Sequence, residues 1–219
     1  MIQQNRVRSW CLFLAAAALA VMASGGLAAA QRKAAAATPA AGSSSGKTLG
    51  EKTAPITMEV FSDFQCPACR ELYQNTLRQV FETYVQAGKV YFIHRDYPLP
   101  MHKHSRDAAR IANAAARIGK FEPVCEALYG RQDVWGADGS VEAVVASVLT
   151  PGEMKRVREL LKTGNLDAAI EKDISLGQSY RVTQTPSVFI TNRGQMTPLA
   201  PGGVNYRFLK EYLDHLLRQ

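Results

Sequence analysis

The sequence lacks a second CxxC motif, and this absence argues against a structural zinc site. Cys66 and Cys69 could supply half of such a site, but the other half usually comes from another CxxC or a closely spaced His pair. After position 69 the only cysteine is Cys125, and the histidines are His94, His102, His104 and His215. His102 and His104 are two residues apart, so they do not share a helix face. We therefore expect neither a bound metal nor another cofactor.

Long runs of basic residues are also absent. The chain has 26 Lys and Arg against 19 Asp and Glu, which gives a formal net charge of +7, and these charges are spread along it. A spread of this kind favours solubility, whereas nucleic-acid binding usually needs clustered Lys and Arg. We therefore predict no nucleic-acid partner.

The amino-terminal region lacks an apolar run of the roughly 20 residues that a membrane-spanning helix needs. Its apolar stretch, residues 11–23, follows Arg6 and Arg8 and precedes the small residues Ala28-Ala29-Ala30. This pattern predicts a cleaved signal peptide over residues 1–30, with a retained amino-terminal anchor as the alternative. We therefore expect a periplasmic, cell-envelope or secreted protein, in a compartment where disulfides persist.

Residues 31–53 have little apolar bulk and are dominated by Ala, Ser, Gly and Pro. Such a composition cannot bury enough apolar surface to fold, so we predict a disordered, flexible linker there. With a retained anchor, this linker would hold the domain off the membrane. The remaining residues, 54–219, are enough for one domain with a full core.

The motif Cys66-Pro67-Ala68-Cys69 follows a predicted buried strand, residues 56–61, and a short loop, residues 62–65. A helical period begins at the motif, and Pro67 suits a first helical turn because it lacks an N–H. Cys66 should therefore lie at a helix N-terminus, where free N–H groups and the helix dipole can lower a cysteine pKa from about 8.5 to roughly 3.5–7.5. The three-residue offset places the Cβ atoms of Cys66 and Cys69 about 5–6 Å apart, which is close to what a disulfide needs. Cys66 and Cys69 are the candidate catalytic residues and redox-active disulfide, and Pro67 and Ala68 begin the active-site helix.

The elements after the motif predict an α/β fold that a helical block interrupts. A helix over residues 66–87 and a strand over 89–94 form a crossover, so the first two strands should pair in parallel. The apolar period of this helix places in the core Leu72, Leu77, Val80, Phe81, Tyr84 and Val85. Residues from about 102 to 179 contain only amphipathic helical patterns. A strand hairpin over residues 187–199, with its turn at Asn192-Arg193-Gly194, and a last helix over 205–218 complete the chain.

Three segments together resemble the DsbA-like thiol-disulfide oxidoreductases, which have a thioredoxin fold with an inserted all-helical subdomain. They are the active-site segment 61–69, the turn Arg95-Asp96-Tyr97-Pro98-Leu99-Pro100, and the loop Val182-Thr183-Gln184-Thr185-Pro186-Ser187. The resemblance covers residues 54–219. It implies a cis peptide bond between Thr185 and Pro186, beside the cysteine pair, where Thr185 and Pro186 bind an extended substrate chain. An ordinary trans proline at the start of a strand is the alternative.

The resemblance also implies the activity and its partners. We expect a monomer that donates its Cys66–Cys69 disulfide to unfolded or reduced exported proteins, and a membrane redox partner that reoxidises it. A reductase or isomerase with the same fold is one alternative, because Pro67-Ala68 does not settle the direction of exchange. A non-catalytic thioredoxin-fold module that binds metal or peptide is another.

One family feature is displaced in this sequence. Many relatives carry a buried acid six residues before the first cysteine, where this chain has Val60. The neighbouring Glu59 should point to the opposite face of the strand, and Asp63 is expected to be an exposed loop acid, so neither is assigned a catalytic role. Cys125 is expected to be a small buried residue in the helical block, with a regulatory or intermolecular thiol as the alternative.

Overall fold

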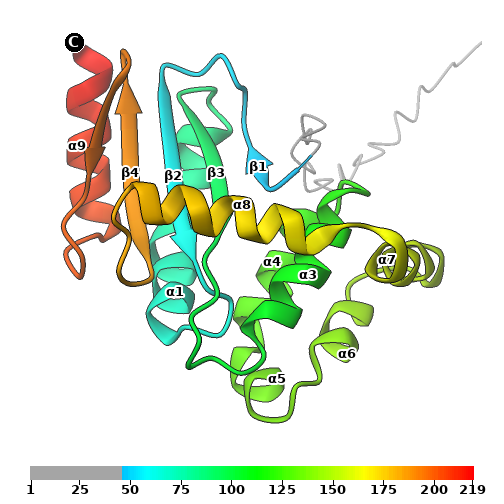
Figure 1. Ribbon diagram of the computed structural model, residues 1–219. Helices are drawn as coiled ribbons and strands as arrows, with labels where there is room; N and C mark the ends of the chain where they lie inside the picture. Colours follow the sequence, from blue (N-terminus) through cyan, green and yellow to red (C-terminus); the bar gives the residue numbers. More distant parts are fainter. Residues whose placement is uncertain (1–45) are drawn as a thin grey trace, which may run out of the picture. The chain divides into compact units, whose positions relative to one another are not determined.

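A computed structural model describes residues 46–219. The predicted signal peptide and most of the predicted linker therefore lie outside the described residues. The centre of the domain is a five-stranded sheet in the order β1-β3-β2-β4-β5 (Figure 1). Its strands are β1 Thr48–Leu49, β2 Ile56–Ser62, β3 Val90–Asp96, β4 Ser187–Asn192 and β5 Gln195–Pro198.

The strand directions follow from the connections between the strands. β2 and β3 are parallel, as predicted, because a helix joins them. β4 pairs with β2 and β5 in antiparallel fashion. The β4–β5 hairpin turns at Arg193 and Gly194, which have φ of 49° and 79°. Two consecutive positive φ values match the twist of a tight hairpin, so the predicted turn is confirmed.

The active-site helix is continuous from Pro67 to Val85 but includes two π-helical turns. Its segments are α1 Pro67–Leu72, η1 Tyr73–Leu77, α2 Arg78–Val80 and η2 Phe81–Val85. The side chains predicted to face the core are all buried: Leu72, Leu77, Val80, Phe81, Tyr84 and Val85. The predicted helix is therefore confirmed, with ends that differ by one or two residues.

The predicted helical block is present between β3 and β4. It contains α3 Ser105–Ala116, α4 Phe121–Gly130, α5 Gln132–Asp138, α6 Val141–Ala146, α7 Pro151–Thr163 and α8 Leu166–Ser179. Helices α3 to α7 gather to one side of the sheet, while α8 runs back across the strands (Figure 1). The block thus returns the chain to the start of β4.

Helices cover both faces of the sheet. The active-site helix and α9, Tyr206–Arg218, contact each other on one face, where Val60 and Leu209 belong to the main core. On the α8 side, Phe61, Val182 and Phe189 form a smaller cluster. Neighbouring strand positions point to opposite faces, which places Val60 and Phe61 in different clusters. The architecture is the predicted thioredoxin fold with a helical insertion.

Residues 46–53 differ from the prediction, which assigned them to the disordered linker. Thr48 and Leu49 form β1 and pair antiparallel with β3. The Lys47 ammonium is largely buried between the carboxylates of Asp96 and Asp173. Composition could not reveal this because the two partners lie 49 and 126 residues away.

Across residues 46–219, no helix combines the length and apolar character needed to cross a membrane.

Candidate active site

Cys66 lies at the N-cap position of α1, as predicted. Its backbone is extended, with φ −76° and ψ 122°, and Pro67 is the first helical residue. The N–H groups of Cys69 and Arg70 both donate to the Cys66 carbonyl at 3.1 Å. The strand-to-helix transition therefore places both sulfurs on the first turn of the active-site helix.

The two thiols differ in exposure and in their partners. Cys66 is 6% exposed and Cys69 only 1%, and both are free thiols in this structure. The Cys66 thiol donates to the Thr185 carbonyl at 3.4 Å, whereas the Cys69 sulfur accepts from the Asp63 N–H at 3.4 Å. Cys66 is thus the sulfur at the edge of the surface, and Cys69 lies beneath it.

Their pKa values shift in opposite directions. The pKa of Cys66 is lowered to about 5, chiefly by a hydrogen bond from the Cys69 thiol. Burial opposes this shift, whereas the Thr185 side chain and N–H groups of the helix add to it. Burial raises the pKa of Cys69 well above its ordinary value, and the hydrogen bond to Cys66 and the negative charge of the Cys66 sulfur raise it further. At neutral pH the reduced pair therefore holds a thiolate at Cys66 and a thiol at Cys69.

The peptide bond between Thr185 and Pro186 is cis, as predicted. It lies beside the cysteine pair, because the Thr185 carbonyl accepts the Cys66 thiol proton. The Thr185 hydroxyl is buried and has no hydrogen-bond partner among the described residues when Cys66 is a thiol. It is therefore free to donate to Cys66 when that sulfur ionises.

Replacing Thr185 with valine is expected to raise the pKa of Cys66 by about one unit. Valine has nearly the same shape but no hydroxyl, and a hydrogen bond to a charged group is worth about 1.5–3 kcal/mol. Thiolate absorbance measured against pH reports the change. Thr183→Val is the control, a matched change at an exposed position of the same loop that should leave the pKa of Cys66 unaltered. An unchanged pKa of Cys66 in Thr185→Val would show that the hydroxyl does not reach the sulfur.

Two glutamines that sequence reasoning missed attach the active-site loop to the helical block. Gln132, the first residue of α5, donates its side-chain amide to the carbonyls of Phe64 at 2.7 Å and Cys66 at 3.0 Å. Gln65 donates to the Gly136 carbonyl at 2.9 Å. The bond to Phe64 satisfies a loop carbonyl that has no other donor among the described residues. Because they connect distant positions, no local motif could reveal them.

Replacing Gln132 with leucine is expected to lower the free energy of unfolding by about 1–3 kcal/mol. Leucine has a similar size but leaves the Phe64 carbonyl without a donor, and an unpaired buried polar group usually costs about 1–3 kcal/mol. Urea unfolding followed by circular dichroism measures the loss. Gln79→Leu is the control, since Gln79 is exposed and bonds only one turn back to Asn75, and equal losses in the two variants would contradict a special role for Gln132.

Asp63 is not the exposed loop acid that was expected. It is 1% exposed, and its carboxylate accepts from the N–H groups of Gln65 and Leu99 and from His102 Nδ1, each at 2.7 Å. The prediction was wrong because these donors, two of them some 36 to 39 residues away, replace water as partners. Asp63 therefore joins the loop before Cys66 to the turn after β3.

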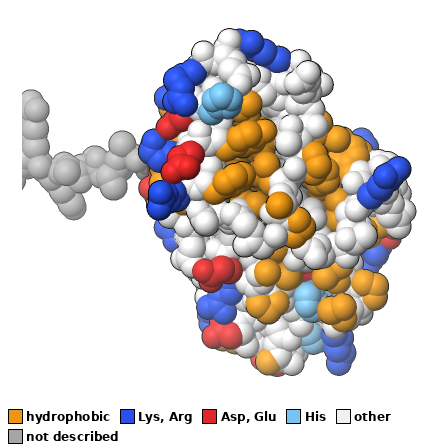
Figure 2. Space-filling model, turned by 90° about the vertical axis from the view of Figure 1, so that its left-hand side faces the viewer, with side chains coloured by type: hydrophobic (Ala, Val, Ile, Leu, Met, Phe, Trp, Pro, Cys, Tyr) orange, Lys and Arg blue, Asp and Glu red, His pale blue; other side chains and the backbone are white. Residues whose placement is uncertain are grey.

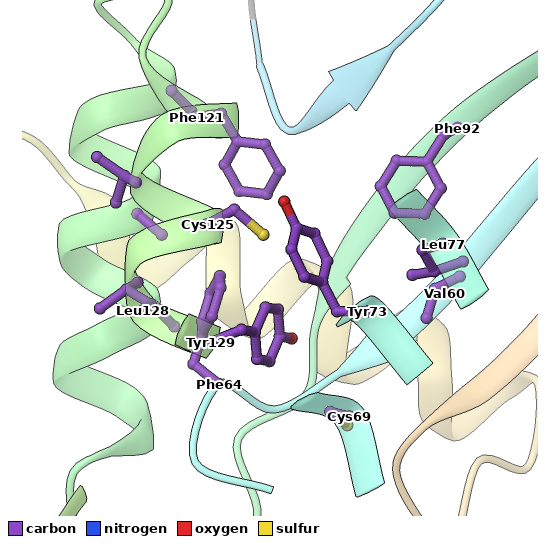
Figure 3. Close-up of a cluster of buried hydrophobic side chains, with 14 of the residues drawn as sticks. Val60, Phe64, Cys69, Tyr73, Leu77, Phe92, Phe121, Cys125, Leu128 and Tyr129 are labelled. Carbon is purple, nitrogen blue, oxygen red and sulfur yellow. The ribbon is translucent and has the colours of Figure 1, made fainter. Parts of the chain in front are cut away.

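Glu59 faces away from the cysteines, as the strand alternation predicted. It accepts from Arg95 at 2.5 and 2.8 Å, while Val60 packs in the core with Cys69 (Figure 3). Glu59 is thus the partner of a cation and not a group beside the sulfurs. The polar partner of Cys69 must come from elsewhere.

Cys125 is buried in α4, as expected of a small core residue. Its sulfur points toward Tyr73 (Figure 3), and burial raises the pKa of its thiol well above the ordinary value. Cys125 is therefore an unreactive thiol in the folded domain.

A groove of about 490 Å³ adjoins the cysteine pair. Ala68 and Leu72 line it from α1, Thr185 and Pro186 from the cis-proline loop, and Leu199 and Val204 from the segment before α9. Figure 2 views the side of the molecule that carries α9 in Figure 1 and shows apolar side chains gathered on that side. The groove could therefore hold apolar side chains of a chain bound at the cis-proline loop.

Residues 43–204 match the thioredoxin family. A probable disulfide bond formation protein D of Bacillus cereus is 26% identical over 153 residues, which cover 67% of this chain and 70% of that protein. The structure of oxidised BdbD from Bacillus subtilis aligns with a TM-score of 0.66 at 21% identity, over 80% of this chain and 94% of that one. The structure of Wolbachia pipientis alpha-DsbA1 aligns with a TM-score of 0.65 at 19% identity, over 78% of this chain and 90% of that one.

Proposed function

Because the chain belongs to the thioredoxin family, we propose that it is a thiol-disulfide oxidoreductase that donates the Cys66–Cys69 disulfide to cysteine pairs of exported proteins. The observation that carries this proposal is the opposed ionisation of the two cysteines, with the pKa of Cys66 lowered to about 5 and that of Cys69 raised. The likeness to disulfide bond formation protein D supports the same chemistry.

The reaction begins when a substrate thiolate attacks the Cys66 sulfur of the oxidised pair. The Cys66–Cys69 bond breaks, a mixed disulfide forms at Cys66, and Cys69 leaves with the electron pair. The second substrate thiol, once deprotonated, then attacks the substrate sulfur of the mixed disulfide. This releases an oxidised substrate and Cys66 as a thiolate, so two electrons have moved from the substrate to the pair.

The proposed direction is oxidation of the substrate. The low pKa of Cys66 stabilises the reduced form of the protein, and a protein with a stable reduced form is a strong oxidant. A reductase must give electrons to its substrate, so it needs a less stable dithiol than the Cys66 thiolate implies.

The substrate is expected to bind as an extended chain along the cis-proline loop. The Thr185 backbone can pair with such a chain in the manner of strand addition, and Pro186 offers no competing N–H. Apolar side chains of the substrate would enter the groove that Leu72, Val204 and Leu199 line. An unfolded chain exposes both its backbone and its apolar side chains, which favours reduced, unfolded proteins as substrates.

The proposed site of action is outside the cytoplasm, with a membrane partner that reoxidises Cys66 and Cys69. The likeness to disulfide bond formation proteins and the apolar segment at residues 11–23 support this placement.

The test mixes the oxidised protein with a reduced, unfolded protein that has two cysteines, in equal amounts. The expected result is one substrate disulfide formed for each Cys66–Cys69 pair reduced, measured by alkylation and mass spectrometry. If the substrate stays reduced, or if the reduced protein instead opens an existing substrate disulfide, the oxidase proposal is wrong.

A further inference from the structure

We propose that Ser62, oriented by Tyr129, donates a hydrogen bond to the Cys69 sulfur and stabilises it as the leaving group when the Cys66–Cys69 disulfide opens. This inference rests on the proposed exchange chemistry and assigns a role to residues behind the cysteine pair.

Ser62 ends β2 directly before the active-site loop. Its hydroxyl lies 2.7 Å from that of Tyr129, which comes from α4 of the helical block. Both side chains are buried, at 5% and 1% exposure. Tyr129 and Cys69 belong to the same buried cluster (Figure 3). The helical block therefore supplies a hydroxyl immediately behind the strand that leads to the cysteines.

The direction of the Ser62–Tyr129 hydrogen bond follows from the available partners. Among residues 46–219, the Ser62 hydroxyl is the one hydrogen-bond partner of the Tyr129 hydroxyl. A buried O–H without an acceptor is costly, so Tyr129 donates to Ser62. Burial raises the pKa of Tyr129 well above its ordinary value, so this proton is always present. A serine oxygen that accepts one bond keeps its own proton for another partner.

That other partner is Cys69. Ser62 lies two residues after Val60 on β2, so its side chain faces the side of the sheet on which Val60 packs with Cys69. It also directly precedes Asp63, whose N–H donates to the Cys69 sulfur at 3.4 Å. Both groups oppose the rise in the pKa of Cys69. With Cys69 only 1% exposed, water cannot serve as a general solvent for its charge. Two protein donors, a backbone N–H and the Ser62 hydroxyl, thus face a sulfur that must briefly carry a negative charge.

The leaving sulfur matters for the rate of exchange. A disulfide opens faster when its leaving thiolate is more stable. When the substrate sulfur bonds to Cys66, Cys69 takes the electron pair of the broken S–S bond and is held as a thiolate by these donors. Its raised pKa then makes it a base for the proton of the second substrate thiol. Cys69 ends as a thiol, and the second substrate sulfur becomes the nucleophile of the next step.

The test compares the opening of the disulfide with the reactivity of Cys66. Ser62→Ala is expected to slow reduction of the oxidised protein by dithiothreitol roughly tenfold, because one donor to the charged leaving group is lost. Alkylation of the reduced protein by iodoacetamide should keep its rate, because Cys66 is then the nucleophile and Cys69 does not leave. Ser105→Ala is the matched control: Ser105 is also buried, and its hydroxyl has no partner in the described chain.

Tyr129→Phe provides a second variant that keeps the buried ring. It should slow reduction less than Ser62→Ala and add nothing in the double variant, because Tyr129 acts through Ser62. Reduction of Ser62→Ala at the wild-type rate would overturn the inference, as would an equal slowing of alkylation. Should Ser62→Ala fail to fold, an unchanged rate in Tyr129→Phe would overturn it. The dithiothreitol assay does not depend on the direction of exchange with proteins, so failure of the proposed oxidase function would show only in the substrate assay.

Discussion

Replacing Cys66 with alanine is expected to reduce substrate oxidation to the uncatalysed rate. Cys66 carries the stabilised thiolate and lies at the edge of the surface beside the Thr185 carbonyl. Without it no mixed disulfide forms at the groove, and no other described thiol can replace it, because Cys69 and Cys125 are buried and their pKa values are raised. Formation of disulfides in a reduced, unfolded protein measures the loss.

The other two cysteines provide the controls for this experiment. Cys69→Ala should also abolish oxidation, since it cannot form the donor disulfide, but it should accumulate a mixed disulfide when offered an oxidised substrate peptide. Cys125→Ala should retain activity, because its sulfur lies in the core away from the groove. Full activity of Cys66→Ala would refute the enzymatic proposal and favour a binding module.

Replacing Lys47 with methionine is expected to lower the free energy of unfolding by about 3–5 kcal/mol. Methionine keeps the length of the side chain but removes the cation that the carboxylates of Asp96 and Asp173 share. Asp173 keeps Arg95 as a partner, whereas the fully buried Asp96 loses its lysine, and an uncompensated buried charge costs about that much. Burial disfavours ionisation of Asp96, but the attraction of Lys47 and the interaction with His94 together outweigh it and lower the pKa of that carboxyl. Urea unfolding at pH 7 measures the difference.

The stability that the Lys47–Asp96 pair contributes should depend on pH. A carboxyl whose pKa is lower in the folded protein contributes stability above its unfolded pKa of about 3.9, and loses it as the pH falls toward the folded value. The gap between wild type and Lys47→Met should therefore narrow below about pH 4. Lys210→Met is the control, because it breaks a helical pair whose lysine is half exposed. A loss below about 1 kcal/mol in Lys47→Met would show that the buried ion pairs are not a main source of stability.

The elements that sequence reasoning predicted depend on local patterns. Pro67 after Cys66 identified the helix start, and the apolar period identified the buried side of the active-site helix. The turn at Arg193 and Gly194 followed from local turn chemistry. The cis bond before Pro186 came from the family resemblance, because an isolated proline does not reveal its isomer.

The missed features depend on contacts between distant segments. Asp63 resembled a loop acid, but its carboxylate is enclosed by Leu99 and His102 from the turn after β3. Gln132 is an ordinary polar residue at a helix start until α5 packs against the active-site loop. Lys47 follows a Ser- and Gly-rich stretch, and only the folded sheet brings Asp173 to it. A single sequence contains no local signal for such pairs.

The reduction potential of the Cys66–Cys69 pair, measured at equilibrium with glutathione at pH 7, tests the oxidase proposal most directly. The stabilised Cys66 thiolate predicts a potential more oxidising than roughly −200 mV, because stability of the reduced form drives the pair to accept electrons. A potential near about −270 mV, the value typical of thioredoxin, would contradict it and assign the chain to the reducing members of the family.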